Sequence, residues 1–413
     1  MQTRLRAALL ETPAGREADR ILRTCVHCGF CTAGCPTYQL LGDELDGPRG
    51  RIYLIKEMLE GGRTAGATQL HLDRCLTCRA CETACPSGVR YGRLLEIGRR
   101  HLERVVPRTL RERLLRRALL ATLPRRERFA ALLALARSLR ALLPASLRRA
   151  IPAPGRVGAW PAPRHGRRML VLTGCVQPAV APDINAAAAR VLDGFGISLI
   201  GVDDGCCGAL AHHLSREHAA RGQMRRNIDV WWPEIERGAE ALVVTASGCG
   251  AMIRDYGELL ADEPAYARKA ARISELFRDL GQVVAAELAR PGVTLDVGSA
   301  RNGAPRVAFH APCTLQHGLQ IRGVIEPLLE RAGCRLTPVA GGSLCCGSAG
   351  SYSLLQPAIA RQLRANKLAA LEAGAPDVIV TANIGCLMHL AAGTDRPVRH
   401  WIELLAEAIA PSP

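Results

Sequence analysis

The chain has 413 residues, which is too long for one ordinary hydrophobic core and predicts two or three domains. Its hydrophobic content of 48% suffices to fold without metals or disulfides, and its aromatic content of 4% excludes a stacking platform for single-stranded nucleic acid. The formal net charge is +16, but fifteen Arg and only three Glu lie between Arg99 and Ala150. The excess charge is therefore local, and we expect no nucleic-acid partner.

Seventeen cysteines are the most unusual feature of the composition. The first residues, MQTRLRAALL, carry no apolar signal segment, and the longest apolar run, Phe129–Ala136, is far shorter than the ~20 residues needed to span a bilayer. We therefore expect a cytoplasmic protein, with a peripheral position on the inner membrane as the alternative. In such a reducing compartment, clustered cysteines are metal ligands or reactive thiols rather than disulfides.

The first cysteines form two copies of one run. Residues 25–36 read CVHCGFCTAGCP and residues 75–86 read CLTCRACETACP, and both match the pattern C-x2-C-x2-C-x3-C-P of bacterial ferredoxins. Three cysteines at intervals of three wrap around one iron–sulfur cube, while the fourth completes the other cube. The pattern predicts a helical di-cluster domain of the ferredoxin type over residues 1–95. It assigns to the first [4Fe–4S] cluster Cys25, Cys28, Cys31 and Cys85, and to the second Cys75, Cys78, Cys81 and Cys35.

Zinc is the alternative for these cysteines, because C-x2-C pairs also form tetrahedral zinc sites. Zinc sites usually combine two separated pairs of ligands, whereas each run here carries four cysteines. We therefore favour two cubes, and we interpret the region as an electron conductor because no general base or nucleophile accompanies the cysteines. His27, inside the first run, is interpreted as a loop residue.

Residues 96–167 form a basic helical segment that ends in a proline-rich linker. Apolar positions recur at helical spacing beside arginine, as in LLRRALL and FAALLALARSL. Helices of this kind can lie on anionic membranes or bind an acidic partner. We favour packing of their apolar faces on the chain itself, which is the usual arrangement in a multidomain protein.

From Arg168 onward, short apolar runs alternate with helical patterns, which predicts βαβ units and a parallel sheet. The expected strands are Met169–Thr173, Ile197–Val202, Ala241–Thr245, Arg306–Phe309, Arg335–Val339 and Asp377–Thr381. The expected helices are Asn185–Leu192, Arg216–Trp231, Val324–Arg331 and Ala358–Leu371. The same order occurs twice, so we interpret residues 168–295 and 304–405 as two copies of one Rossmann-like α/β module.

Eight cysteines support this repeat, because they recur in the order C…CCG…C at a separation of 137 to 139 residues. Each follows the expected end of a strand, and such ends share one edge of a parallel sheet, where ligands bind. We therefore predict possible cluster ligands at Cys175, Cys206, Cys207 and Cys249 in the first module and at Cys313, Cys345, Cys346 and Cys386 in the second.

The alternative is that these are buried structural thiols, since free cysteine is commonly buried. Vicinal pairs at matched positions make this interpretation the weaker one. Cys334 has no counterpart in the first module and is expected to be a core residue. The histidines near the cysteines are interpreted as loop residues with satisfied hydrogen bonds: His212, His213, His310 and His317.

The two modules resemble the cysteine-rich CCG domains of heterodisulfide reductases and related oxidoreductase subunits. In that family, the motif ends in C-x-x-C and can bind an iron–sulfur cluster or host thiol chemistry. This sequence departs from it: Ala246 and Met252 flank Cys249 at the two possible positions, and Asn383 and His389 do so around Cys386. Four cysteines remain in each module, which can hold a cluster but lack the fifth thiol.

The whole chain resembles the family of glycolate oxidase (glycolate dehydrogenase) iron–sulfur subunits. The segments that carry this resemblance are residues 25–61, 71–91, 227–233, 245–257, 312–317, 344–352, 381–386 and 398–405, among them TASGCGAMIRDYG and LCCGSAGSY. The resemblance implies an electron-transfer subunit beside flavin-containing partners that oxidise glycolate to glyoxylate. The electrons would pass onward to a membrane acceptor such as a quinone, and no flavin is expected on this chain.

Two other functions stay open at this point. The same architecture serves subunits that act with lactate or glycerol-3-phosphate dehydrogenases. The CCG modules could also make the chain itself a thiol or disulfide enzyme, although the incomplete C-x-x-C motifs disfavour this.

Overall fold

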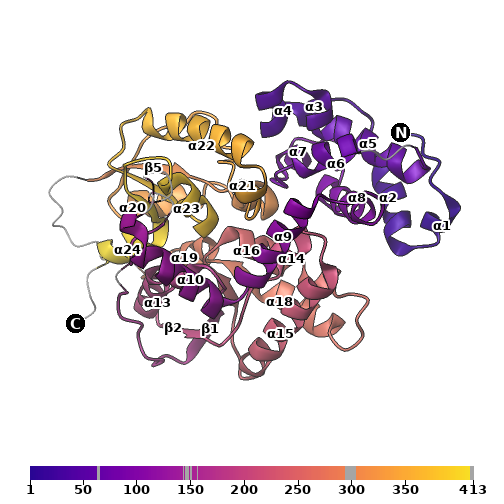
Figure 1. Cartoon of the computed structure of the whole chain (residues 1–413). Coiled ribbons are helices and arrows are strands. Elements are labelled where there is room, and N and C mark those ends of the chain that lie inside the picture. Colours follow the sequence, from indigo (N-terminus) through magenta and orange to yellow (C-terminus); the bar gives the residue numbers. More distant parts are fainter. Residues whose placement is uncertain are drawn as a thin grey trace.

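The computed structural model describes residues 1–62, 66–142, 144, 148, 151–155, 157–293 and 304–409. The last two residues of the predicted first module (294–295) lie outside this part, as do residues 143, 145–147, 149 and 150 of the basic segment and residue 156 of the linker. Within it, a helical N-terminal region lies beside two α/β modules, and the three parts meet near the centre of the molecule (Figure 1).

The N-terminal region is a bundle of short helices around one apolar core that includes the fully buried Leu22, Ile55 and Leu94. α2 begins where the Thr12 side chain accepts a hydrogen bond from the Gly15 amide at 3.0 Å, with a proline in its first turn. The elements are α1 (Ala7–Leu10), α2 (Pro13–Thr24), α3 (Phe30–Ala33), α4 (Pro36–Leu41), the 3₁₀ helix η1 (Glu44–Asp46), α5 (Pro48–Glu60), α6 (Gly66–Asp73), α7 (Ala80–Thr83) and α8 (Tyr91–Val105).

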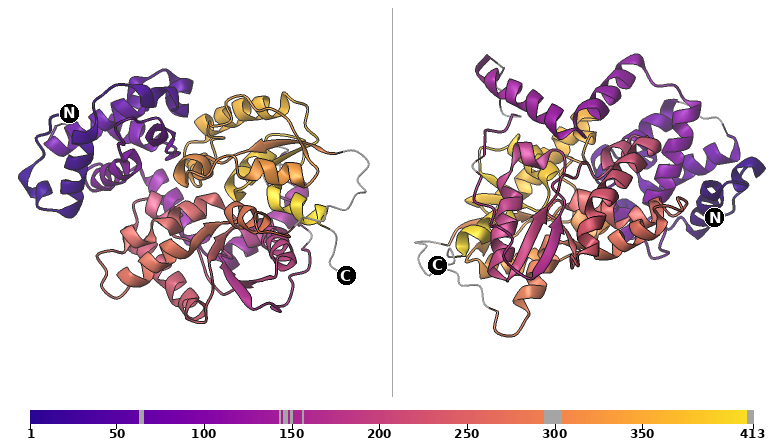
Figure 2. Two further views of the ribbon diagram at one scale, coloured as in Figure 1. Left: turned by 180° about the vertical axis from the view of Figure 1, so that it is seen from behind. Right: turned by 90° about the horizontal axis from the view of Figure 1, so that it is seen from below.

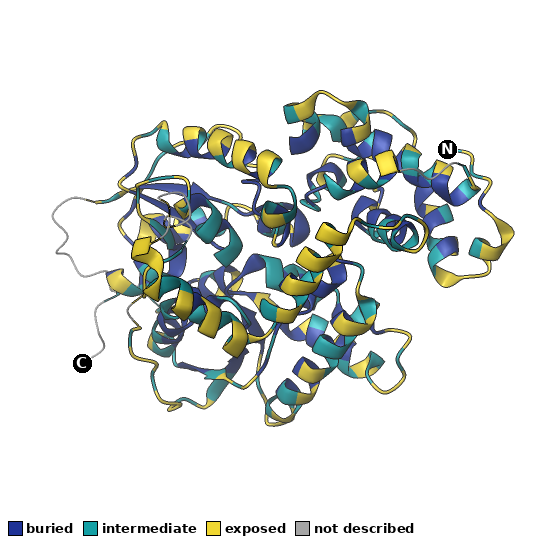
Figure 3. Ribbon diagram, in the orientation of Figure 1, coloured by how far each residue is buried: buried dark blue, intermediate teal, exposed yellow. Residues whose placement is uncertain are grey.

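The basic segment forms α9 (Leu110–Thr122), α10 (Arg126–Ser138) and a 3₁₀ turn η2 (Arg140–Leu142). The two helices extend away from the body of the molecule when it is seen from below (Figure 2). Leu119 and Leu133 are the buried residues of these helices, and the rest of their surface is largely exposed (Figure 3). We expected the apolar faces of these helices to pack on the chain. This expectation is wrong for most leucines of α9 and α10, because Leu119 and Leu133 alone among them are buried.

The two modules contain four-stranded parallel sheets with the same strand order, β2-β1-β3-β4 and β6-β5-β7-β8. This confirms the predicted α/β class and the repeat of one module. Two strands of three residues each, β4 and β8, were not predicted. The strands are β1 (Arg167–Val171), β2 (Ile197–Gly201), β3 (Leu242–Val244), β4 (Phe277–Asp279), β5 (Arg306–His310), β6 (Arg335–Leu336), β7 (Val378–Thr381) and β8 (Val398–His400).

Helices follow the strands, and all four predicted helices are present as α13, α15, α20 and α22 with slightly different bounds. The first module contains α12 (Gln177–Val180), α13 (Asp183–Gly194), α14 (Ala209–His213), α15 (Glu217–Glu236), α16 (Ser247–Arg254), α17 (Tyr256–Leu259), α18 (Ala267–Leu276) and α19 (Leu280–Leu288). The second contains the π-helix η3 (Thr314–Gly318), α20 (Ile325–Arg331), α21 (Tyr352–Leu355), α22 (Pro357–Glu372), α23 (Ile384–Ala391) and α24 (Trp401–Ala408).

The two modules share one hydrophobic core, to which the fully buried Trp231 and the nearly fully buried Trp401 contribute from different modules. Polar contacts cross the same boundary. The His400 imidazole lies 2.9 Å from the Thr245 carbonyl oxygen, and the Gly248 amide donates to Asn383 Oδ1 at 3.1 Å. The two modules therefore pack against each other through a shared core and are not independent domains.

The helical region contacts the first module through ion pairs. Glu96 lies 3.0 Å from His212, Arg90 lies 2.7 Å from Glu258, and Arg100 pairs with Glu217. The Arg90–Glu258 and Arg100–Glu217 side chains are partly exposed, so solvent and salt screen the attraction within these two pairs, whereas His212 is buried.

Contacts between the helical region and the second module are of another kind. Leu76 packs into an apolar cluster with Tyr352, whose hydroxyl donates to the Arg74 carbonyl oxygen at 3.0 Å. His317 lies 3.1 Å from the Thr83 hydroxyl. Burial and neutral hydrogen bonds therefore hold this side of the helical region.

Asp279 makes the stability of the first module depend on pH. Burial raises the pKa of its carboxyl to about 7, against the opposing hydrogen bond from the Gly281 amide. The unfolded chain loses this proton near its ordinary pKa of 3.8, whereas the folded chain keeps it until about 7. Raising the pH through this window therefore favours the unfolded state.

Replacing Asp279 by asparagine keeps a hydrogen-bond acceptor for Gly281 and removes the titrating proton. We expect the stability of the Asp279→Asn variant relative to wild type to grow as the pH rises from about 5 to about 7, by up to about 1.4 kcal/mol per pH unit. Denaturant unfolding of both proteins at several pH values measures this. Parallel pH profiles for the two proteins would contradict it.

Candidate metal centres

The two cysteine runs of the N-terminal region fold into loops with the same backbone. The residues on either side of the second cysteine have positive φ angles, 57° and 85° at His27 and Gly29, and 54° and 61° at Thr77 and Arg79. Each loop then enters a one-turn helix, α3 or α7. Three of these four residues are not glycine, so both loops hold a conformation that costs free energy. Loops of this type direct backbone N–H groups towards an anionic group.

Five cysteines from both loops line one cavity. Cys25, Cys28 and Cys31 come from the first loop, Cys81 and Cys85 come from the second, and Tyr91 is also part of the lining. Burial and then the neighbouring Cys25, Cys28 and Cys85 together raise the pKa of the Cys31 thiol to about 11. The structure thus brings together the four residues predicted for the first cluster.

The other four cysteines form a second, deeper group. Burial raises the pKa of Cys81, and the nearby Cys78, Cys75 and Cys35 add to this shift. The Tyr91 hydroxyl donates to the Cys75 sulfur at 3.5 Å. The structure therefore also groups the cysteines predicted for the second cluster, and Tyr91 lies between the two groups.

The spacing of the sulfurs distinguishes clusters from zinc. A single zinc ion holds four sulfurs at about 2.3 Å from itself, so that they crowd together. Among the described residues, two groups of three potential ligands lie within 4.8 Å of one another, and neither includes a cysteine of residues 25–85. These cysteines surround their sites at wider spacing, which fits a cube of iron and sulfide better than one ion.

A buried cation lies beside the second group. Arg51 is 1% exposed, and its guanidinium donates to the His71 carbonyl oxygen at 2.7 Å and pairs with the fully buried Asp46 at 3.3 Å. Burial disfavours its charge, but Cys75, Tyr91, Cys35 and Asp46 together raise its pKa. A fixed positive charge here stabilises added negative charge at the neighbouring cysteine group. Asp46 and His71, with Asp43, form the other group of close potential ligands among the described residues, and Arg51 and Arg74 already pair with the Asp46 carboxylate.

In the first module, the four predicted cysteines lie at the carboxyl edge of the sheet. Cys175 follows β1, the vicinal pair follows β2 and Cys249 lies in α16 after β3. Their sulfurs form a row and lie close enough to shift one another's pKa values, from Cys175 through Cys206 and Cys207 to Cys249. Asn227 and Tyr256 hold the pair in place through its backbone carbonyls.

The second module repeats this row. The Cys313 and Cys345 sulfurs are 3.7 Å apart, Cys345 contacts Cys346, and Cys346 contacts Cys386. All four residues are buried. His310 adds a nitrogen donor at one end of the row, because its ring lies within 4.8 Å of Cys346 and Cys386.

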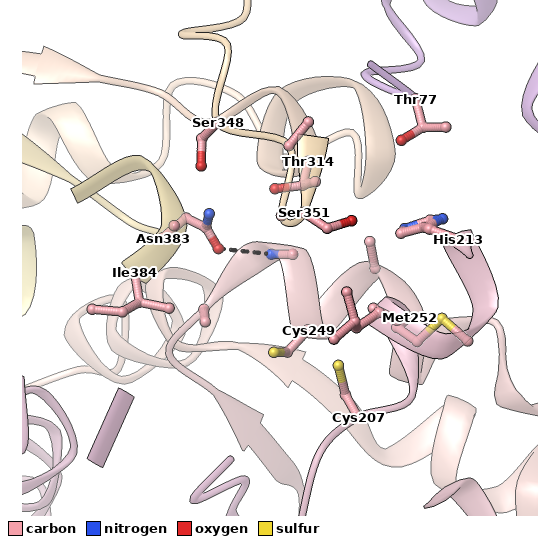
Figure 4. Close-up of a pocket in the computed structure, with 18 of the residues that line it drawn as sticks. Thr77, Cys207, His213, Cys249, Met252, Thr314, Ser348, Ser351, Asn383 and Ile384 are labelled. Atoms are coloured by element: carbon pink, nitrogen blue, oxygen red, sulfur yellow. Dashed lines mark hydrogen bonds between the residues drawn. The ribbon is translucent and has the colours of Figure 1, made fainter. Parts of the chain in front are cut away.

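The cysteine rows of both modules and one member of the second cysteine group line one cavity of about 970 Å³. Cys78 lines it from the helical region, Cys249 from the first module and Cys313 from the second. Cys207 and Cys249 lie side by side on one wall, while Ser348 and Asn383 come from the second module (Figure 4). Burial and then the nearby Cys313 raise the pKa of Cys78, so these two thiols are close neighbours.

Several predicted roles have a clear structural outcome. Cys334 is 8% exposed within the shared core, as expected. His317 is hydrogen-bonded at both ring nitrogens, to Thr83 and to the Ser343 carbonyl, and His212 pairs with Glu96. The expected loop positions are wrong for all four histidines, since His212 and His213 lie in α14, His317 in η3 and His310 in β5. In the described part of the chain, neither ring nitrogen of His310 has a hydrogen-bond partner. The sequence signal that could have found it is its place three residues before Cys313, at the end of a strand.

Family models match both parts of this architecture. A 4Fe-4S dicluster domain matches residues 21–89, and a cysteine-rich domain matches residues 169–254 and 307–391. The chain is therefore an iron–sulfur protein with [4Fe–4S] clusters in its helical region and a repeated cysteine-rich domain behind them.

Proteins with similar sequences show to which family of iron–sulfur proteins the chain belongs. The glycolate oxidase iron-sulfur subunit of Escherichia coli (strain K12) is 53% identical over 412 residues, which cover 99% of each chain. The probable glycolate oxidase iron-sulfur subunit of Bacillus subtilis (strain 168) is 29% identical over 94% of each. Lactate utilization protein A of Shouchella clausii is 25% identical and matches only 56% of this chain. The chain belongs to the family of glycolate oxidase iron–sulfur subunits.

Gly347, which follows the second vicinal pair, is required by close packing as well as by its φ of 89°. A Cβ atom there would lie 2.6 Å from the Ala360 carbonyl oxygen and 3.0 Å from the Leu363 Cβ. Gly350 offers a matched control, because its φ is 62° and nothing lies within 4 Å of its Cβ position.

We expect Gly350→Ala to lower the free energy of unfolding by about 1 kcal/mol, the cost of the left-handed conformation alone. Gly347→Ala should cost on the order of 3 kcal/mol because backbone atoms must also move. Anaerobic denaturant titration of both variants measures the difference, and equal losses would show that packing at this turn is unimportant.

Proposed function

We propose that this chain conducts electrons from flavin-containing partner subunits, which oxidise glycolate to glyoxylate, towards a membrane acceptor such as a quinone. In this role the chain carries no substrate site of its own, and oxidation takes place on the partners. The single observation that supports this most is the convergence of the second cysteine group, through Cys78, and the cysteine rows of both modules around one cavity. The name of the 53% identical relative supplies the substrate.

We assign the first [4Fe–4S] cluster to Cys25, Cys28, Cys31 and Cys85, and the second to Cys75, Cys78, Cys81 and Cys35. Their grouping in space supports this assignment. The [4Fe–4S] groups supply one-electron carriers when bound. The protein holds them in buried loops and places Arg51 beside the second one, which raises its reduction potential relative to the same loop without the cation.

The first cluster is the natural point of electron entry. Cys28 is exposed, and the neighbouring Val26 and Phe30 are 66% and 65% exposed. Exposed apolar side chains beside a redox centre are typical of a surface that a partner covers. The second cluster lies deeper and next to Cys313, so electrons entering at the first would move inward.

Electron paramagnetic resonance on the native complex, purified anaerobically, tests the substrate. We expect glycolate to produce reduced-cluster signals, whereas lactate and glycerol-3-phosphate leave the clusters oxidised. Reduction by dithionite alone would keep the clusters but overturn the link to glycolate. Reduction by lactate or glycerol-3-phosphate instead would assign the chain to another dehydrogenase.

Two variants serve as controls for the ligand assignment in the same measurement. Cys78→Ser removes a proposed ligand and should abolish the signal of the second cluster. Cys334→Ser changes a buried cysteine of the shared core and should leave both cluster signals intact.

We also propose that α9 and α10 lie on an anionic membrane surface. No helix in the described part of the chain is long and apolar enough to cross a bilayer. Leu110, Leu114, Leu132 and Leu135 are 68%, 55%, 50% and 56% exposed. Exposed arginines flank them at positions 104, 111, 113, 117, 125 and 128. Exposed leucines between arginines match the apolar and anionic layers of a membrane interface.

Leu114→Glu and Leu135→Glu should each weaken binding of the chain to vesicles that contain anionic lipid by roughly tenfold, because each places a charge where apolar burial is needed. Leu70→Glu is the control, since Leu70 is 43% exposed on α6, outside this surface. Co-sedimentation with anionic and with neutral vesicles measures the effect. Binding to neither vesicle type would exclude the membrane and favour an acidic partner protein, and equal binding to both would exclude a role for anionic lipid.

A further inference from the structure

The central cavity has the size and the lining of a site for a small organic molecule. Its volume is about 970 Å³, and pockets that hold such molecules measure roughly 300 to 1,000 Å³. Apolar side chains from all three parts of the chain line it, among them Leu76, Met252 and Ile384 (Figure 4). Polar side chains such as Thr77 and His213 lie between them. A lining of this kind suits a largely apolar molecule with a few hydrogen-bonding groups.

One wall of the cavity belongs to the turn between α9 and α10. Leu123 and Phe129, at the two ends of this turn, line the cavity. Arg126 lies between them and donates hydrogen bonds to the Gly174 carbonyl oxygen at 3.2 Å and to the Asp204 carbonyl oxygen at 3.1 Å, which fixes the turn on the first module. The two helices spread apart from this turn and carry the exposed leucines that we place on a membrane surface (Figure 2). An apolar path therefore leads from these helices into the cavity.

His213, at the end of α14, provides an acid–base group in the cavity. Its ring is accessible from the cavity and packs edge-to-face on His212, with the ring centroids 5.7 Å apart. His212 Nε2 lies 3.0 Å from Glu96, whose side chain is 23% exposed. Burial and the neighbouring His212 lower the pKa of His213 to about 4 against the opposing charge of Glu96, and Arg99 and Arg79 are the other charged groups within reach. A neutral imidazole can receive a proton on one nitrogen and pass one on from the other.

The same end of the cavity adjoins the second cysteine group. Thr77 lines the cavity beside Cys78, which we assign as a ligand of the second cluster. Arg79, two residues after Thr77, lies within electrostatic reach of His213. A molecule bound between Thr77 and His213 therefore has an electron donor on one side and a proton carrier on the other.

We propose that a lipid-soluble quinone binds in this cavity between Thr77, His213 and Met252, with its tail leaving past Leu123 and Phe129, and is reduced there to the quinol. This rests on the proposed electron-transfer function, because the electrons come from glycolate through the clusters.

The electrons and protons of this step balance. Oxidation of one glycolate to glyoxylate releases two electrons and two protons, and one quinone takes up both pairs as its two carbonyl oxygens become hydroxyl groups. The electrons arrive one at a time through the second cluster. His213 donates a hydrogen bond to one carbonyl oxygen and passes on protons that enter from solvent through Glu96 and His212.

The test measures how fast reduced clusters are reoxidised in the anaerobically purified native complex. The clusters are reduced with glycolate, mixed with a quinone that carries a ten-carbon tail, and followed by freeze-quench electron paramagnetic resonance. The variants are His213→Leu, which removes the proton carrier, and Phe129→Asp, which places a charge in the path of the tail. The control is His218→Leu, because His218 is an exposed histidine on α15 that is not part of the cavity lining. Ferricyanide, which takes up one electron and no proton, replaces the quinone in a parallel experiment.

We expect all variants to keep both cluster signals and their reduction by glycolate. His213→Leu should slow reoxidation by saturating quinone about a hundredfold. Phe129→Asp should instead raise the quinone concentration needed for half the maximal rate by roughly tenfold. The control should match wild type, and ferricyanide should reoxidise all proteins equally fast.

Wild-type reoxidation by quinone in both cavity variants would overturn the proposal. Equal slowing with quinone and ferricyanide would also overturn it, because the damage would then lie in the clusters. If glycolate does not reduce the clusters, the proposed function fails, but clusters reduced with dithionite still test the quinone site separately.

Discussion

The structure depends on bringing many cysteine sulfurs together in places that water does not reach. Burial raises the cost of each thiolate, and every neighbouring thiolate raises it further, as the thiols of Cys31, Cys78 and Cys81 illustrate. An iron–sulfur cluster resolves this conflict because its iron ions compensate the thiolate charges. The strained loops at Thr77 and Arg79 and the buried Arg51 have the same purpose, since they direct N–H groups or positive charge to these positions. Most of the local structure is therefore explained by one electrostatic requirement.

The cysteine groups and the two parallel sheets could be predicted because the spacing of residues in the sequence determines them. The intervals of three within each cysteine run fixed the two cluster groups, and the repeated C…CCG…C pattern fixed two parallel sheets with equivalent edges. The short strands β4 and β8 were missed because three residues such as Phe277–Asp279 carry too little alternation to separate a strand from the helices on either side. Pairing with β3 defines that strand, and pairing depends on tertiary structure.

Residues whose role depends on what lies opposite them were also hard to predict. Leu119 and Leu135 share a helical pattern, yet one packs against the chain and the other faces solvent. His310 and His317 look alike in the sequence, and only the structure shows that one is satisfied and the other is not. The common cavity could not be foreseen either, because it requires three separately predicted parts to meet at their cysteine-bearing edges.

The two sides of the helical region are attached by different forces, and this gives ionic strength a role inside the molecule. Ion pairs such as Arg90–Glu258 and Arg100–Glu217 join it to the first module, whereas apolar packing around Leu76 and the Tyr352 hydrogen bond join it to the second. Added salt weakens the former and leaves the latter in place. The contact that places Cys78 beside Cys313 is therefore the less salt-sensitive of the two attachments. The rate of electron transfer between the centres at Cys78 and Cys313 should then be nearly independent of salt concentration, although the ion pairs with the first module weaken as salt is added.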